Sequence, residues 1–233
     1  MNTQPLYLDD SYLKEFDGLV LLSGPKYAVL DKTAFYPEGG GQPSDTGFLK
    51  WNGEELSVFR VIKRGSQIFH YLEGNVPKGV EVRGKVDWAQ RFWNMRRHSA
   101  EHLLTGLIEQ RGVSPKSFSN LERLEYVDDK VNEKLLESVA AEFNSIVETG
   151  VRVETYYEKR EKVEVDGDPR KMAFLEKIPR NIDLIRMVEI GGHALTFCMG
   201  THVGNTRDIG KVVDLTLEDA RKGRQIVKFL LER

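Results

Sequence analysis

The sequence contains only one cysteine, Cys198, among 233 residues. A single cysteine cannot form a disulfide within the chain, so its thiol is unmodified, modified or bound to a metal. Long apolar runs are also missing, which excludes a membrane-spanning helix of the usual length. Residues 1–16, MNTQPLYLDDSYLKEF, carry acidic groups and no apolar stretch, so neither a signal peptide nor a transit peptide is predicted. We therefore expect a cytoplasmic protein with no membrane association.

An excess of positive charge is missing as well. The formal net charge is −2 at pH 7, whereas affinity for nucleic acid normally depends on Lys and Arg residues that neutralise phosphates. Contact with RNA would have to use local basic segments, although the plainest interpretation of each segment is a solvated surface. These segments contain Arg91, Arg96 and Arg97; Lys159, Arg160 and Lys162; and Arg221, Lys222, Arg224 and Lys228.

The composition that is present is that of a folded protein. Hydrophobic residues make up 40% of the chain and charged residues 30%, which distinguishes it from disordered and membrane-spanning chains. Between residues 19 and 86, short apolar runs alternate with segments rich in Gly, Pro, Asn and Asp. This spacing predicts a small β-barrel or a sandwich.

The pattern changes at Asp87. Residues 88–112 carry apolar residues near helical spacing and end at Gly112, as a capped helix does. Residues 130–150 repeat the helical period. The apolar stripe expected for this second helix consists of Leu135, Val139, Phe143 and Ile146.

The remainder of the chain mixes both periods. Residues 151–165 alternate as a strand does, residues 168–178 predict a further helix, and several short strands follow. We expect an α+β protein in which a β-barrel domain at residues 1–87 carries a glycine-rich motif and an α+β domain occupies residues 88–233.

Two pairs of residues have the spacing of metal ligands. His98 and His102 stand four residues apart in HSAEH, within the first predicted helix, so their imidazoles lie on one face. Cys198 and His202 have the same separation in CMGTH, and Gly200 between them permits a tight backbone turn. The one cysteine and three of the five histidines thus form two matching pairs, which predicts a shared metal site.

Three imidazole nitrogens and one thiolate suit zinc, whose tetrahedral sites favour nitrogen and sulfur donors. The pattern leaves open whether all four residues form a closed structural site or whether one stands off and leaves a catalytic position. Thermolysin-like chemistry is disfavoured because Ser99 rather than glutamate follows the first histidine. Nucleoside deamination is disfavoured because it requires more than one cysteine.

The segment LDKTAFYPEGGGQPSDTGFL is rich in glycine. Consecutive glycines permit positive φ and close approach of the backbone to another surface. Thr33 and Gln42 add neutral hydrogen-bonding groups. Taken alone, the segment favours an ordinary hairpin connection, and it lacks the Gly-Lys-Ser/Thr ending of a phosphate-binding loop. The glycines are Gly39, Gly40 and Gly41.

Three motifs occur in a characteristic order: TAFYPEGGGQ with a following SDTG, then HSAEH with two leucines after it, then CMGTHV. Together they resemble the editing domain of alanyl-tRNA synthetase and its free-standing relatives, the AlaX proteins. The chain is similar to the medium-length type, because about thirty residues follow CMGTHV. Met199 stands where relatives usually have glycine, and this difference bears on substrate preference.

The resemblance implies that residues 88–233 form the editing domain and that the glycine-rich segment packs beside its metal ligands. The zinc ligands that it implies are His98, His102, Cys198 and His202. On the same basis Thr33 and Gln42 are assigned as catalytic residues. The substrate-binding residues are assigned as Thr33, Gly39, Gly40, Gly41 and Gln42.

The activity implied by the resemblance is hydrolysis of the ester that joins a wrong amino acid to the 3′-terminal ribose of tRNA. The expected partner is tRNA(Ala) mischarged with serine or glycine, and a monomer is expected. A non-catalytic tRNA-binding module with structural zinc remains an alternative. Another alternative is a zinc hydrolase that acts on small esters or amides.

Overall fold

The structure is a computed structural model that describes residues 2–113, 117–119, 123–126, 131–163, 175–176, 178–220 and 224–233. The chain divides into two compact units. The first unit contains residues 1–95 and 200–202, and the second contains residues 96–199 and 203–233. Strands and helices both occur, which confirms the expected α+β class.

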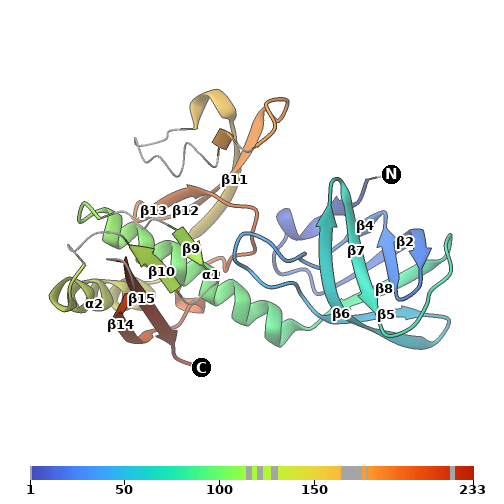
Figure 1. Cartoon of the computed structure of the whole chain (residues 1–233), viewed down its shortest axis with the longest axis horizontal. Coiled ribbons are helices and arrows are strands. Elements are labelled where there is room, and N and C mark those ends of the chain that lie inside the picture. The colour runs from blue at the N-terminus through green and yellow to red at the C-terminus, as the bar shows by residue number, and fades with distance from the viewer. Residues whose placement is uncertain are drawn as a thin grey trace. The chain divides into compact units, whose positions relative to one another are not determined.

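The first unit is built around a closed barrel with the strand order β2-β3-β7-β6-β5-β8, all neighbours being antiparallel. The small barrel predicted from the spacing of apolar runs is therefore confirmed (Figure 1). A short parallel pair, β1 with β4, accompanies it. The elements are β1 (Gln4–Pro5), η1 (Leu6–Leu8), β2 (Glu15–Gly24), β3 (Tyr27–Leu30), β4 (Lys32–Thr33), β5 (Gly47–Trp51), β6 (Glu54–Arg64), β7 (Gln67–Leu72) and β8 (Glu81–Val86).

Alternating burial explains why these segments form a barrel. Side chains of β7 and β8 are buried at every second position, as expected for strands with one face toward the core. The core includes Phe35, Leu49, Val58, Val61, Ile68 and Leu72. Removing this apolar surface from water is the dominant favourable contribution to folding of the unit.

A histidine is buried inside the barrel. His70 on β7 is fully buried; its Nδ1 lies 3.2 Å from the Ala28 carbonyl oxygen and its Nε2 lies 2.8 Å from Thr33 Oγ1. A neutral imidazole satisfies both contacts, with Nδ1–H donating to the carbonyl and the Thr33 hydroxyl donating to Nε2. Burial lowers the pKa of His70 to about 4, partly offset by the bond to Ala28.

This histidine should make folding sensitive to acid. Because the pKa of His70 is depressed in the folded state, its contribution is complete above pH 6.5 and is lost as the pH falls toward 4. From that shift, wild type should lose about 3 kcal/mol more free energy of unfolding than His70→Gln between pH 7 and pH 4. Urea titrations at both pH values measure this difference. Parallel losses in the two proteins would contradict it, and His193→Gln serves as the matched histidine control.

Arg91 is buried, which corrects its interpretation as part of a solvated basic surface. Its side chain has no exposed area, and its Nε donates to Asp45 Oδ1 at 3.0 Å. The same guanidinium donates to the Ser11 and Ala34 carbonyl oxygens. Asp45 also accepts from the Tyr36 amide at 2.6 Å. The pair therefore ties the first turns of the following helix to both ends of the glycine-rich segment.

The second unit contains two sheets and most of the helical residues. One sheet has the order β14-β15-β10-β9 and the other the order β11-β12-β13. The elements from α1 onward are α1 (Trp88–Glu109), β9 (Ser117–Ser119), β10 (Arg123–Tyr126), α2 (Glu133–Thr149), β11 (Val153–Lys159), η3 (Arg160–Lys162), β12 (Leu184–Ile190), β13 (Ala194–Phe197), η4 (Thr206–Asp208), β14 (Val212–Ala220) and β15 (Arg224–Leu231). The helices predicted at 88–112 and 130–150 are both confirmed.

The buried face of α2 differs slightly from the predicted stripe. Leu135 is only half-buried, whereas its neighbour Leu136 is almost completely buried. The Asn132 side chain caps the helix by accepting from the Leu135 amide at 3.0 Å, and Asn144 exchanges two hydrogen bonds with the backbone of Val212 at the start of β14. These contacts set the rotation of the helix. The buried residues are Leu136, Val139, Phe143, Ile146 and Val147.

Three further sequence features are the remaining basic segments, the helix predicted at 168–178 and the lack of a membrane-spanning helix. Arg160 donates to the backbone carbonyls of four residues, so this member of a basic segment organises the chain. Residues 221–223 and most of the helix predicted at 168–178 lie outside the described residues. Within the part of the chain that the structure describes, no helix is long and apolar enough to cross a membrane.

Candidate metal centre

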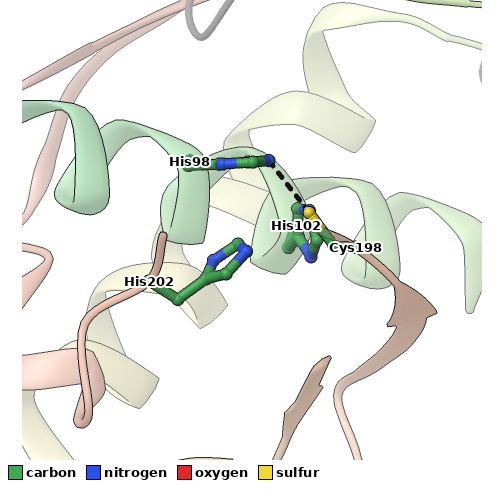
Figure 2. Close-up of side chains that lie close together, drawn as sticks. All are labelled: His98, His102, Cys198 and His202. Carbon is green, nitrogen blue, oxygen red and sulfur yellow. Dashed lines mark hydrogen bonds between the residues drawn. The ribbon is translucent and has the colours of Figure 1, made fainter. Parts of the chain in front are cut away.

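The two predicted ligand pairs come together in the structure. One possible ligand atom from each of His98, His102, Cys198 and His202 lies within 4.8 Å of the other three. Figure 2 shows both pairs, with the imidazole of His98 directed toward the sulfur of Cys198. Folding therefore brings together two pairs that are about a hundred residues apart in the sequence.

The first pair is presented by α1. The Asp87 carboxylate accepts from the Gln90 amide at 3.2 Å, which places an acceptor at the positive end of the helix. His98 and His102 follow on consecutive turns, and their ring centroids are 4.9 Å apart at an interplanar angle of 83°. Both side chains are buried, so neighbouring atoms restrict the movement of the two rings.

The helix approaches the segment before β13 closely at Gly106. A methyl group at Gly106 would lie 2.3 Å from the His193 carbonyl oxygen and 2.7 Å from Ala194 Cβ. Glycine is therefore required by space here, not by backbone conformation. Gln110 Nε2 adds a hydrogen bond of 3.0 Å to the same carbonyl. These contacts hold the start of β13 against the helix that carries the histidines.

Cys198 directly follows β13. Its amide donates to the Arg186 carbonyl oxygen at 3.2 Å, so the β12–β13 ladder continues for one residue beyond Phe197. The Arg186 guanidinium donates to the Cys198 carbonyl oxygen at 2.7 Å, and its side chain is almost completely buried. Cys198 is thus held from both sides of its peptide by one residue of the neighbouring strand.

The chain between Cys198 and His202 is held by side chains from the sequence motifs. Gln42 makes two hydrogen bonds with Thr201: its Nε2 donates to Oγ1 at 2.9 Å, and its Oε1 accepts from the amide at 3.1 Å. Ser99 Oγ accepts from the Val203 amide at 3.2 Å. Because these contacts flank His202, they restrict the backbone that presents its imidazole.

The electrostatics of the cluster favour neutral imidazoles. Burial is the largest cause that lowers the pKa of His98 well below its usual value, with His102 and Arg186 adding to the effect. Burial and then Arg186 lower the pKa of His102 to about 4. Neutral imidazole is the form that binds a metal ion, so both histidines are ready to act as ligands at neutral pH.

One distance in the cluster matches the spacing of zinc ligands, and the four candidate atoms span up to 4.8 Å. A tetrahedral zinc site with nitrogen and sulfur donors places its ligand atoms roughly 3.3–3.6 Å apart. His98 Nε2 and Cys198 Sγ are 3.4 Å apart, within that range. Glu101, also buried, brings Oε2 to 3.5 Å from His102 Nε2. Carboxylates beside ligating histidines commonly orient the ring.

The residues predicted to bind substrate differ in burial: the three glycines are exposed, and Thr33 and Gln42 are buried. Gly40 and Gly41 adopt positive φ of 56° and 84°, as the glycine run predicts. All three glycines are exposed, and a Cβ at Gly39 or Gly40 would meet no described atom within 4 Å. Thr33 is fully buried, where its hydroxyl contacts His70 and accepts from the Phe35 amide at 3.1 Å.

Several residues of the centre were not predicted from the sequence. Ser99 and Glu101 lie inside HSAEH, but nothing in the motif distinguishes them from surface positions of a helix. Thr201 lies inside CMGTH and is found only through its contact with Gln42. Arg186 is the one basic residue within the apolar segment IDLIRMVEI. A basic residue between apolar neighbours is a signal from which its burial could have been predicted. Met199, the departure from the family pattern, has a side chain that is 49% exposed.

Comparisons with known proteins find similarity to tRNA synthetases and to alanyl-tRNA editing proteins. Residues 14–90 match the family described as tRNA synthetases class II (A), and residues 185–226 match the threonyl and alanyl tRNA synthetase second additional domain. The chain is 36% identical over 237 residues to the alanyl-tRNA editing protein AlaX-M of Saccharolobus solfataricus, covering 99% of both chains. It is 33% identical to AlaX-M of Methanosarcina barkeri, covering 98% of this chain and 99% of the relative. Alanine–tRNA ligase of Thermoplasma acidophilum is 36% identical over 90% of this chain, which spans 25% of that enzyme.

Proposed function

The chain belongs to the AlaX-M family of alanyl-tRNA editing proteins, and from that premise we propose that it deacylates tRNA(Ala) mischarged with serine or glycine. It is an enzyme of the aminoacyl-tRNA deacylase class, a hydrolase of carboxylic esters. The observation that carries the proposal is the cluster of His98, His102, Cys198 and His202 in a chain related over its full length to editing proteins.

We propose that these four residues hold one zinc ion. When bound, zinc would supply a Lewis acid that activates a water molecule or orients the substrate. The residues around the cluster have supporting roles. Arg186 fixes the peptide of Cys198, and Gln42 fixes Thr201 immediately before His202. We therefore assign Gln42 to catalysis through the hydrogen bonds that hold this turn.

The activation barrier for hydrolysis of this ester is low. An aminoacyl ester is an activated acyl group, so positioning a water molecule and polarising the carbonyl suffice for hydrolysis. Editing is needed because a synthetase pocket that accepts alanine cannot strongly reject glycine by size or serine by one added hydroxyl. A site that hydrogen-bonds the serine hydroxyl would disfavour alanine, which would leave those groups unpaired.

We propose Thr33 for the serine contact and the backbone of Gly39, Gly40 and Gly41 with Gln42 for the remaining substrate contacts. The proposed substrate contacts lie within residues 1–87, and all four proposed metal ligands lie within residues 88–233. The partner would be tRNA(Ala). The protein would bind it as a monomer in the cytoplasm.

Replacing Thr33 by Val should reduce selectivity for serine. Valine keeps nearly the same volume but removes the hydroxyl, so the ratio of kcat/KM for seryl-tRNA to that for alanyl-tRNA should fall about fivefold, equivalent to about 1 kcal/mol. Glycine should be affected less, because it has no hydroxyl. The measurement is deacylation of all three charged tRNAs by wild type and variant.

The hydrogen bond between Thr33 and His70 requires a control for this experiment. Thr33→Val also leaves the imidazole without that hydroxyl, which should lower stability by about 1–3 kcal/mol. Thr33→Ser keeps the hydroxyl and should retain the selectivity. A ratio unchanged in Thr33→Val would remove Thr33 from the serine-binding role while leaving its structural role intact.

The proposed activity is tested by comparing seryl-, glycyl- and alanyl-tRNA(Ala) as substrates. Hydrolysis of the seryl and glycyl forms with little loss of the alanyl form is expected. Binding of all three without turnover would instead support a tRNA-binding module with structural zinc. Equal hydrolysis of small amino acid esters and charged tRNA would support a general zinc esterase.

A further inference from the structure

Four aromatic side chains form a continuous strip on the barrel: Tyr27 on β3, Phe59 on β6, and Phe69 and Tyr71 on β7. Ring centroids are 5.5 Å apart for Tyr27 and Phe69, 6.4 Å for Tyr27 and Tyr71, and 6.3 Å for Phe59 and Tyr71. The strands that carry them are neighbours in the order β3-β7-β6. We call these four residues the aromatic strip.

The aromatic strip lies on the outer face of the barrel. Phe69 and Tyr71 are half-buried and alternate with the buried Ile68, His70 and Leu72. On β6, a bulge between Val58 and Arg60 leaves two consecutive residues, Phe59 and Arg60, facing outward. Phe59 is 48% exposed as a result. Figure 1 shows β6 and β7 as adjacent strands of the barrel wall.

Arginine residues accompany the rings. The Arg64 guanidinium carbon lies 5.4 Å from the centre of the Phe69 ring, and Arg64 donates to Tyr71 Oη at 3.3 Å. Arg60 is the register partner of Tyr71 and is paired with Glu38 at 2.6 Å. Glu54 and Glu55 lie at the opposite end of β6. Arg64 therefore supplies a cation directly beside Phe69 and Tyr71, and the charge of Arg60 is paired with that of Glu38.

Cross-strand aromatic pairs can stabilise a sheet without any ligand. That role does not require Phe59 to be half exposed or the arginines to line the same face. Aromatic faces with adjacent cations are the chemistry that binds unpaired nucleotides, because bases stack on the rings and phosphates pair with arginine. Sheets with outward aromatics on neighbouring strands use this arrangement to bind RNA.

We propose that the aromatic strip, with Arg60 and Arg64, binds unpaired nucleotides of the tRNA substrate. The identity of this RNA rests on the proposed function, whereas the stacking chemistry rests on the strip itself. The strip would contribute to tRNA affinity and leave the hydrolytic step unchanged.

The test compares tRNA binding by full-length variants, measured by fluorescence anisotropy with uncharged tRNA(Ala). Loss of stacking of one base should weaken the affinity of Phe59→Leu/Tyr71→Leu about fivefold to a hundredfold. Phe48→Leu is the matched control, because Phe48 is 45% exposed on β5 and lies outside the strip. Affinity of the double variant equal to that of the control would overturn the proposal.

Two further measurements separate stacking from general charge and from folding. Arg64→Gln should lower the slope of log affinity against log salt concentration by about 0.7–1, the effect of one lost phosphate contact. The indole introduced by Phe59→Trp should be quenched by tRNA but not by a blunt RNA duplex that has no unpaired nucleotides. Absence of quenching by tRNA would also overturn the proposal, and this readout does not depend on a variant that loses a ring.

Kinetics distinguish this proposal from the proposed function. In the double variant, KM for seryl-tRNA should rise by the factor seen in binding while kcat stays unchanged. If wild type had no deacylase activity, the function would fail, yet the anisotropy and quenching experiments would still decide whether the strip binds tRNA. A fall in kcat with unchanged affinity would reject the strip as a tRNA-binding surface.

Discussion

Replacing His102 and Cys198 together by alanine is expected to abolish zinc binding and to lower kcat/KM for seryl-tRNA at least about a hundredfold, because a bound metal contributes several kcal/mol. Each residue supplies one of four donors that lie within 4.8 Å of one another. Removing one member of each pair leaves two donors, which is too few for the closed coordination that zinc prefers. Wild-type protein should hold about one zinc per chain after chelation and repletion.

Elemental analysis and deacylation assays of the same preparations test this expectation. His193→Ala is the matched control, since His193 directly precedes β13, the strand that leads to Cys198, but is not a member of the cluster. It should retain both metal and activity. Unchanged zinc stoichiometry in the double variant would place the metal elsewhere, and retained activity in metal-depleted protein would show that zinc has no catalytic role.

Replacing Arg91 by Met is expected to destabilise the first unit by about 3–5 kcal/mol, because it leaves the buried Asp45 carboxylate without its counter-charge. Both side chains have no exposed area in the structure. The variant also removes hydrogen bonds to the Ser11 and Ala34 carbonyl oxygens. Since the pair holds the segment that contains Gln42, editing activity should fall as well.

Tryptophan fluorescence during urea unfolding measures this effect directly, because all three tryptophans, Trp51, Trp88 and Trp93, lie in the first unit. Arg83→Met is the matched control. Arg83 forms an exposed pair with Glu15, so its loss should change the free energy of unfolding very little. A change in Arg91→Met no larger than in the control would mean that the buried pair contributes no more than a surface pair.

Local sequence patterns predicted much of the fold. The alternation of short apolar runs predicted the barrel, and the helical period predicted α1 and α2, because both periods reflect backbone geometry within a few residues. The stripe on α2 was displaced at its first position, where Leu136 replaces Leu135 in the core. Contacts of α2 with β14 decide that rotation, and they join residues far apart in the sequence.

The sequence by itself determined the chemistry available to this protein: one thiol, two ligand pairs at a spacing of four residues, and a glycine run that can adopt positive φ. These properties are local, so residue types and spacing suffice to predict them. Only the tertiary structure decided that the two pairs meet, that Gln42 binds Thr201 and that Arg91 and Arg186 are buried. Charged residues are usually solvated, and their burial depends on partners supplied by distant segments, which no local pattern specifies.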